Sequence, residues 1–298
     1  MDETDPAIGN VLCPIVTPFE DDSVDLDSLG RHAEWLVDQG VDGIVACGTT
    51  GEFPSMTWTE RESVVRSLVA AVGDRATIIP CTAATAVEDA ISRIQAVDAL
   101  GADAVLLPPP YFHGPNDPRG VERFYDRVLE RVESLVMLYN IPQYATELPP
   151  GIVASLATRE EVIGLKDSSG NLHQFVELKA RLPSDFRMYQ GWDLLAIPSL
   201  AIGGSGTITG LTNIAPGRYR SIADAMARED LAGARTIVNE TIVDLVNICA
   251  ETGYVPGIKA YLAREGRITS RAVRPPLLDL DEDDQPFISE LGDSLTDT

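Results

Sequence analysis

Lysine is nearly absent from this chain. Its 298 residues include 23 basic ones, but only Lys166, Lys179 and Lys259 are lysines. Lysine is normally a common surface residue. In a chain with so few lysines, each one is less easily explained as an ordinary surface residue. Lys166 ends the apolar run VIGL and is followed at once by the polar sequence DSSGN. Its place, where a strand should meet a loop, makes it the first candidate for chemistry.

Cysteine is also scarce, and no two cysteines have the spacing of a redox or zinc motif. The four are Cys13, Cys47, Cys81 and Cys249. Widely separated cysteines in apolar runs are typical of small buried side chains in a reducing compartment. The chain also lacks an apolar run of membrane-spanning length and a basic, apolar N-terminal segment. These absences predict a soluble, cytoplasmic protein with no membrane partner.

Positive charge is the third deficit. The chain has 46 acidic residues, and its formal net charge is −23. A field of this sign repels nucleic acid and anionic membranes, so neither is an expected partner. The acidic run at 279–285 lacks the spacing and the glycine of an EF-hand, and no metal site is predicted. The balance is typical of a folded protein from a salt-rich, haloarchaeal cytoplasm, where salt screens the repulsion.

What the sequence does have is a regular alternation of short apolar runs and helical patterns. Eight runs rich in Val and Ile are strand candidates, at 11–19, 41–48, 76–83, 102–110, 135–142, 162–169, 186–191 and 204–210. Near-continuous apolar strands predict a parallel sheet that is buried on both faces. Helical periodicity lies between them, as at 26–40, 57–73, 86–101 and 117–132.

Eight such units predict a (β/α)8 TIM barrel rather than a doubly wound open sheet, since no GxGxxG or Walker loop is present. Further helical patterns follow, at 231–251 and 256–267. We therefore expect a barrel over residues 1–230 and a C-terminal helical extension over residues 231–298, packed on the barrel.

The active site of a barrel lies at the carboxyl ends of its strands. Lys166 ends the sixth strand there. Burial among apolar neighbours would favour its neutral amine, which can attack a carbonyl and form a Schiff base. A lysine at a strand end can equally form a salt bridge or extend its charged end to water. Position alone leaves these two interpretations open.

Other strand ends add polar groups to the same edge. The GTTGE sequence at 48–52 offers the hydroxyls of Thr49 and Thr50 and backbone N–H groups between glycines, which suit a small carboxylate. Tyr139 ends the fifth strand with a phenol that can relay a proton. Taken alone, the GTTGE sequence is equally well explained as a glycine-rich turn capped by threonines, and Tyr139 as an aromatic residue of the core. His113 has no metal-ligand pattern and is read as a loop residue at the rim.

Taken together, these motifs resemble those of a known superfamily. GTTGE, YNIP and GLKDSSGN stand in the order and spacing of the dihydrodipicolinate synthase / N-acetylneuraminate lyase superfamily, and the resemblance spans nearly the whole chain. Members are class I aldolases on a (β/α)8 barrel, usually tetramers. The resemblance implies a homotetramer without a separate cofactor, in which Lys166 forms a Schiff base with pyruvate or another 2-oxo acid. It also implies that Tyr139 relays protons, that Thr49 and Thr50 hold the carboxylate, and that the backbone of Ile208 faces the pyruvyl group.

Two departures concern the second substrate. Dihydrodipicolinate synthase has an arginine after its YN-x-P motif, which binds the carboxylate of the aldehyde. This chain has Tyr144 there, beside Gln143. That enzyme also usually has a tyrosine pair after the fourth strand, and the second tyrosine completes the proton relay in the neighbouring subunit. Here the pair is Tyr111-Phe112, so that hydroxyl is missing.

The departures favour a 2-keto-3-deoxy sugar acid as substrate. The chain would cleave 2-keto-3-deoxygluconate or its 6-phosphate to pyruvate and glyceraldehyde or its 3-phosphate, with Tyr111, Gln143 and Tyr144 near the second half of the substrate. Three alternatives remain. These are a sugar-acid dehydratase of the same superfamily, 4-hydroxy-tetrahydrodipicolinate synthase, and a non-catalytic pyruvate-binding protein, although a binder has no need of a nucleophilic amine.

Overall fold

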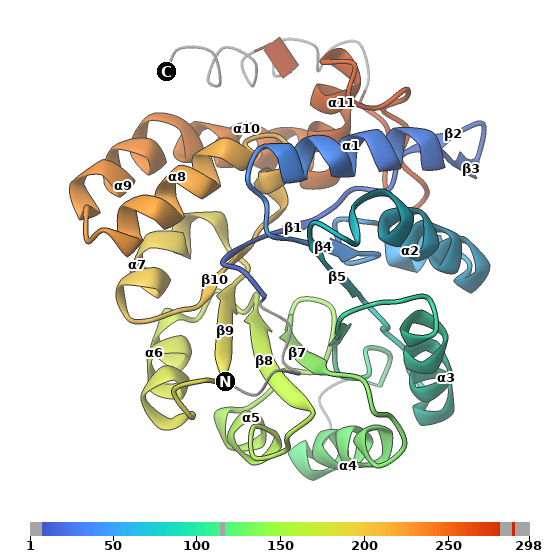
Figure 1. Ribbon diagram of the computed structural model, residues 1–298, viewed down its shortest axis with the longest axis vertical. Helices are drawn as coiled ribbons and strands as arrows, with labels where there is room; N and C mark the ends of the chain where they lie inside the picture. The colour runs from blue at the N-terminus through green and yellow to red at the C-terminus, as the bar shows by residue number, and fades with distance from the viewer. Residues whose placement is uncertain (1–7, 114–116, 281–287, 290–298) are drawn as a thin grey trace.

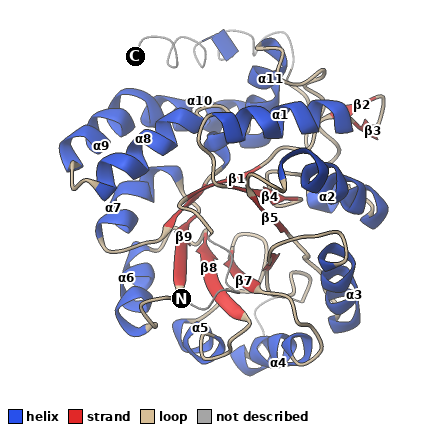
Figure 2. Cartoon of the chain, viewed as in Figure 1, coloured by secondary structure: helices blue, strands red, loops and turns tan. Residues whose placement is uncertain are grey.

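The computed structural model describes residues 8–113, 117–280 and 288–289. Eight parallel strands form its centre, and helices surround them (Figures 1 and 2). The strands are β1 (Val11–Pro14), β4 (Gly43–Ala46), β5 (Thr77–Pro80), β6 (Val105–Leu107), β7 (Val136–Asn140), β8 (Val162–Asp167), β9 (Arg187–Gln190) and β10 (Gly206–Ile208). Each lies inside one of the eight predicted ranges. Their order is β5-β4-β1-β10-β9-β8-β7-β6, and a parallel bridge between Cys81 and Leu106 joins its two ends. The predicted (β/α)8 barrel is confirmed.

The helices form the outer layer. They are α1 (Leu26–Asp38), α2 (Trp58–Val72), α3 (Val87–Asp98), α4 (Pro118–Leu129), α5 (Pro150–Leu156), α6 (Leu172–Arg181), α7 (Ala196–Ala201) and α8 (Pro216–Ala227). Polar side chains cap the starts of α1, α2, α4 and α6,. Thr57, for example, forms a capping box at the start of α2 with Glu60,. The helices α5, α6 and α7 were not singled out in the sequence. Neither was the β2 (Phe19–Glu20) and β3 (Ser23–Val24) hairpin.

Further helices follow the barrel. They are α9 (Leu231–Ile237), the π-helical segment η4 (Val238–Ile242), α10 (Val243–Thr252) and α11 (Tyr254–Arg264). In Figure 1, α10 and α11 lie beside α1 at one side of the barrel. The predicted division at residue 230 falls between α8 and α9, and as a domain boundary it stays a prediction. Most of the acidic run at 279–285 lies outside the described residues.

In the regular barrel strands, alternate residues enter two different cores. Residues such as Val11, Ile44 and Leu138 pack outward against the helices. Their neighbours Leu12, Val45 and Met137 pack with residues of the other strands inside the barrel. The side-chain period of two therefore explains why the strands are apolar throughout. None of the helices in the described part of the chain combines the length and apolarity needed to span a bilayer.

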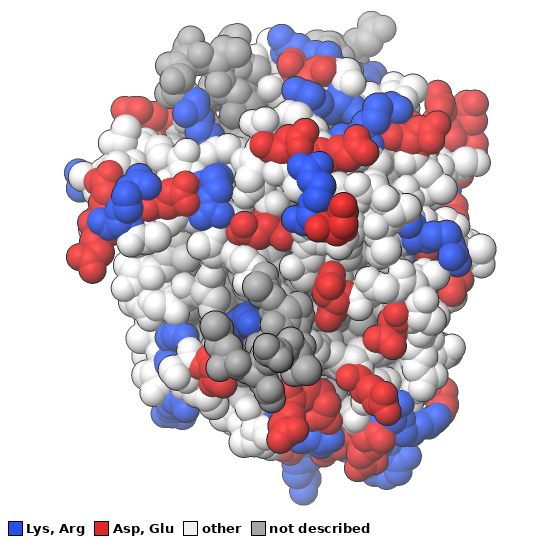
Figure 3. Space-filling model, viewed as in Figure 1, with Lys and Arg blue, Asp and Glu red and all other residues white. Residues whose placement is uncertain are grey.

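Acidic side chains gather at the surface. On the face seen in Figure 3 they are scattered over much of the surface, with basic side chains among them. Several form exposed pairs, such as Arg75 with Asp38 and Arg131 with Glu88. Exposed pairs of this kind contribute little to stability, so the packed strands and helices carry the fold.

One buried histidine gives stability a specific pH dependence. His32 of α1 is fully buried, and its Nε2 lies 3.2 Å from Oδ1 of Asn213. Asn213 in turn donates to the carbonyls of Pro14 and Gly210 and accepts from Val16 N–H. Burial lowers the pKa of His32 from 6.5 to about 4. The unfolded chain therefore binds a proton between these pH values that the folded chain does not, and stability falls as pH falls.

We expect His32 to account for about 3 kcal/mol of lost unfolding free energy between pH 6.5 and pH 4, at about 1.4 kcal/mol per pKa unit. The variant His32→Gln keeps a polar side chain but cannot titrate there, so its unfolding free energy should depend less on pH. Denaturant titrations at a series of pH values measure this, with the exposed His173→Gln as control. Equal pH slopes for wild type and His32→Gln would contradict the assignment.

Candidate active site

The site begins with the pairing of β7 and β8. Their register sets Tyr139 opposite Lys166 and Asn140 opposite Asp167. On the other side, β9 sets Tyr189 opposite Lys166. Tyr139 and Tyr189 both pack inside the barrel. Because paired residues on neighbouring strands point to the same face, Lys166 also points inward.

An irregularity in β8 gives Lys166 this direction. Ile163 packs inside the barrel, so strict alternation would turn residue 165 inward and Lys166 outward,. Leu165 instead packs outward against the helices. The register explains the change, since Val136 faces Val162 but Met137 faces Gly164, which adds one residue to β8. A one-residue shift reverses every later side chain of a strand, and here it brings the amine into the barrel.

The surroundings of Lys166 are largely dry and aromatic. Only 4% of the residue is exposed, and its Nζ lies 4.5 Å from the centre of the Tyr139 ring. The tyrosine hydroxyl is within 3.4 Å of Oγ1 of Thr49. An amine and a phenol from two strands and a hydroxyl from the loop after a third thus lie together inside the barrel. Such a set can bind a carbonyl compound and move a proton at it.

The residues next to Tyr139 and Lys166 hold the two strands together from outside the barrel. Nδ2 of Asn140 donates to Oδ1 of Asp167 over 3.0 Å, and Oδ1 of Asn140 accepts from the N–H of Leu148. Asp167 also accepts from the N–H and the hydroxyl of Ser169. Burial raises the pKa of Asp167, and these hydrogen bonds oppose the rise. Each of the YN and KDSS motifs therefore places one side chain inside the barrel, Tyr139 or Lys166, and the next one outside, where Asn140 and Asp167 join the two strands.

The GTTGE sequence forms the loop after β4, here called the GTTGE loop (residues 48–52). It is closed by hydrogen bonds from Glu52 N–H to the carbonyl of Thr49 and from Phe53 N–H to the carbonyl of Gly48. Cys47, just before it, and Glu52, its last residue, both have left-handed backbones, with φ of 51° and 58°. Non-glycine residues adopt this conformation only where their surroundings impose it, and such residues gather at functional sites.

These groups line one cavity of about 320 Å³. It brings together most of the predicted site residues: Thr49, Thr50, Tyr139, Gln143, Tyr144, Lys166 and Ile208. Tyr111 does not line it. It lies in an adjoining groove with His113 and Tyr144, where its ring meets the edge of Phe53 with centroids 6.0 Å apart. Among the described residues that line the cavity, only Lys166 is basic.

Asp193 and Tyr254 also line the cavity, although the sequence analysis assigned neither of them a role. Asp193 is buried and accepts hydrogen bonds from the hydroxyls of Tyr219 and Tyr254, the latter over 2.5 Å. Burial raises the pKa of Asp193, and the two hydroxyls oppose the rise. Asp193 follows the seventh barrel strand, where the strand-end rule collects candidates. Tyr254 comes from α11, and only packing brings it to the mouth, where a Cβ on Gly210 would lie 2.4 Å from its ring.

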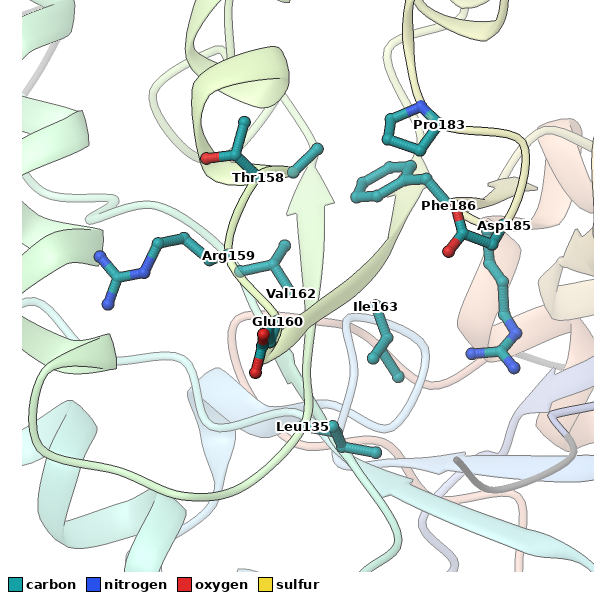
Figure 4. Close-up of a pocket in the computed structure, with 11 residues that line it drawn as sticks. Leu135, Thr158, Arg159, Glu160, Val162, Ile163, Pro183, Asp185 and Phe186 are labelled. Atoms are coloured by element: carbon teal, nitrogen blue, oxygen red, sulfur yellow. The ribbon is translucent and has the colours of Figure 1, made fainter. Parts of the chain in front are cut away.

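A second hollow lies at the other end of the same strands (Figure 4). Leu135, Val162 and Arg187 line it from the amino ends of β7, β8 and β9, together with Arg159 and Asp185. Barrels carry out their chemistry at the carboxyl ends of the strands, so this hollow is not part of the candidate site. Within the described residues, no group of three or more His, Cys, Asp and Glu side chains could hold a metal ion.

Comparison with known proteins gives consistent matches along the chain. Residues 7–293 match the Dihydrodipicolinate synthetase family. A protein of Desulforudis audaxviator (strain MP104C), named 4-hydroxy-tetrahydrodipicolinate synthase, is 33% identical over 276 residues, 92% of each chain. A protein of the same name from Anaeromyxobacter sp. (strain Fw109-5) is 36% identical over 231 residues, 77% of this chain and 78% of that one.

The fold matches solved structures equally well. The chloride-inhibited dihydrodipicolinate synthase of Acinetobacter baumannii, solved in complex with pyruvate, superposes with a TM-score of 0.91 and 31% identity. The superposition covers 96% of this chain and 99% of that chain. Similarity in both sequence and fold therefore extends over the barrel and the helices that follow it.

Proposed function

Because this chain belongs to the dihydrodipicolinate synthetase family, we propose that it is a pyruvate-dependent lyase whose Schiff base forms on Lys166. Enzymes of the family use a covalent Schiff base between a lysine and pyruvate, without a metal or other cofactor. The observation that supports Lys166 in this role is its inward position, 4.5 Å from the Tyr139 ring in a cavity with no other basic residue in its described lining.

The proposed reaction starts at the carbonyl of pyruvate. The neutral amine of Lys166 attacks C2, and loss of water gives an iminium. The iminium withdraws electrons from C3, so C3 can lose a proton and become the carbon nucleophile of an enamine. Tyr139, with Thr49 at 3.4 Å, relays the protons that the carbonyl oxygen and C3 exchange,. The hydroxyls of Thr49 and Thr50 hold the carboxylate, and the backbone of Ile208 faces the pyruvyl group.

The first candidate for the aldehyde partner follows the relatives. The relative that matches over 92% of this chain is named 4-hydroxy-tetrahydrodipicolinate synthase, and its similarity supports condensation of pyruvate with aspartate semialdehyde. The sequence analysis ranked this reaction behind the sugar-acid reactions. The comparisons favour it, and they offer no support for a 2-keto-3-deoxygluconate aldolase.

The lining of the cavity favours the second candidate, the 2-keto-3-deoxy sugar-acid aldolase. A carboxylated aldehyde entering a cavity needs a cation or several donors. Within the described part of the chain, the lining residues offer no basic group beyond Lys166, and Tyr144 stands where the resemblance places an arginine. Gln143 and Tyr144 are neutral partners that suit hydroxyl groups. The dehydratase alternative uses the same Schiff base and shares this support.

Reduction with borohydride in the presence of pyruvate should attach a pyruvyl group to Lys166, because reduction converts the iminium to a stable amine. Peptide mass spectrometry locates the adduct. Lys166→Ala should fold as judged by circular dichroism and give no adduct. Tyr139→Phe is the matched control, since it keeps the amine. It should still be trapped while turnover falls by about a hundredfold or more. A wild-type adduct at another residue, or none, would contradict the proposal.

The two candidates for the aldehyde partner differ in charge, and turnover assays separate them. Condensation of pyruvate with aspartate semialdehyde supports the synthase, whereas release of pyruvate from 2-keto-3-deoxygluconate supports the aldolase. If Tyr144 replaces an anion-binding arginine, Tyr144→Arg should raise kcat/KM for aspartate semialdehyde by about tenfold, as one charge-assisted hydrogen bond allows. Tyr144→Phe is the control without charge. If the wild type prefers aspartate semialdehyde and Tyr144→Arg adds nothing, the argument from the lining is wrong.

We further propose that the protein works as a cytoplasmic homotetramer at high salt. The net charge of −23 makes the folded surface repel itself unless salt screens it,. Phe112 and Tyr144 are 80% and 66% exposed near the mouth, which suits a contact between subunits,. We expect light scattering to give a tetramer in multimolar salt and circular dichroism to show loss of structure on dialysis into low salt. A monomer at high salt would refute the tetramer. Full stability at low salt would refute the need for high salt.

A further inference from the structure

A second lysine of this lysine-poor chain is buried beside the active-site loop. Lys259 lies on α11, and its side chain is fully buried. Its Nζ is 2.7 Å from Oε1 of Glu52, which is only 1% exposed, and 4.1 Å from the centre of the Phe19 ring. Burial lowers the pKa of Lys259, and the charge of Glu52 opposes this. Residues 207 positions apart thus form an ion pair that water does not reach.

Glu52 is the last residue of the GTTGE loop, and its left-handed backbone is held from both carboxylate oxygens. Oε1 binds Lys259, and Oε2 accepts the backbone N–H of Arg274 over 2.9 Å. Within the loop, Glu52 N–H binds the carbonyl of Thr49 over 3.1 Å. The side chain of Thr17 donates to the carbonyl of Gly51 over 2.8 Å. The position of Thr49 therefore depends on a residue whose own conformation is fixed from outside the barrel.

We propose that Lys259 is a positioning residue for the reaction, which acts through Glu52 to hold Thr49 within hydrogen-bonding distance of Tyr139. The proposal rests on the proposed function, because it assigns Lys259 to the proton relay of that reaction. Lys259 itself does not line the cavity. The helical extension thereby becomes part of the catalytic apparatus, although it supplies no reacting group through this contact.

The choice of an ion pair supports a positioning role. A buried pair costs desolvation, and well-packed apolar residues often stabilise a protein as well or better. An ion pair also fixes the orientation of the Glu52 side chain, since its carboxylate must face the ammonium group of Lys259. The GTTGE loop needs a fixed position, because the contact between Thr49 and Tyr139 is already 3.4 Å long and a small displacement would break it,.

Exchange of the methyl hydrogens of pyruvate in D2O tests the role without any aldehyde. Each cycle needs the Schiff base, loss of a proton from C3 and its return as deuterium, and NMR follows the rate. Lys259→Met should slow exchange by about tenfold or more, as misplacement of a catalytic group does. Thr49→Val should also slow it. In the double variant Lys259→Met/Thr49→Val, the exchange rate should be less than twofold below that of Thr49→Val alone, because the hydroxyl that Lys259 positions is already gone. If the two substitutions instead reduce the rate by the product of their separate effects, the proposal is wrong.

Stability is separated from positioning by two further variants. Lys259→Met leaves the Glu52 carboxylate buried and unpaired, which can unfold the chain. The variant Lys259→Met/Glu52→Gln removes that charge, and it should fold and still show the slow exchange. Ile258→Ala, at the neighbouring buried position of α11, is the matched control. It should lower Tm without changing the exchange rate of the folded protein. If Lys259→Met/Glu52→Gln catalyses the exchange of the pyruvate methyl hydrogens at the wild-type rate, Lys259 has only a structural role.

The outcome also distinguishes this inference from the proposed function. If borohydride traps pyruvate on wild-type Lys166 but Lys259 and Thr49 behave independently, the Schiff-base lyase stands and the role of Lys259 fails. If the wild type neither forms the adduct nor exchanges the methyl hydrogens, the proposed function itself fails.

Discussion

The register between β7 and β8 is the constraint on which the rest of the site depends. It pairs Tyr139 with Lys166, and the extra residue in β8 turns Lys166 into the barrel, the side to which Tyr139 already points. The same pairing places Asn140 and Asp167 back to back on the outside, where they bond to each other. The inward side chains of the candidate site and the outward side chains that anchor the strands thus lie on two faces of one short segment. Without the added residue, the amine would face the helices.

The helical extension completes what the barrel leaves open. Tyr254 at the start of α11 packs on Gly210 and donates to Asp193, which closes one wall of the cavity. One turn further along, Lys259 reaches the end of the GTTGE loop. A single helix therefore contacts the site at two places. The fold alone would allow many chemistries, and these contacts limit which groups can meet.

Much of this arrangement could be predicted from the sequence, because it depends on local patterns. The eight apolar runs marked the barrel strands, and the rule that barrels react at strand ends brought Lys166, Tyr139 and the GTTGE loop to one edge. The direction of Lys166 could not be predicted this way, since it depends on a register shift between strands 25 residues or more apart. Tyr254 and Lys259 were missed for the same reason, because only the packing of α11 brings them near the loop. The second substrate was judged from two replaced residues, Phe112 and Tyr144, and the comparisons favour another reaction.

The central claim is that Lys166 holds pyruvate covalently while Thr49, Thr50 and Tyr139 surround it. A crystal structure of the protein soaked with pyruvate tests this most directly. The account predicts continuous electron density from Nζ of Lys166 to C2 of pyruvate, with the carboxylate on the two threonine hydroxyls and the Tyr139 hydroxyl beside the former carbonyl. Pyruvate bound elsewhere, or an unmodified Lys166 beside a fully occupied pyruvate, would contradict it.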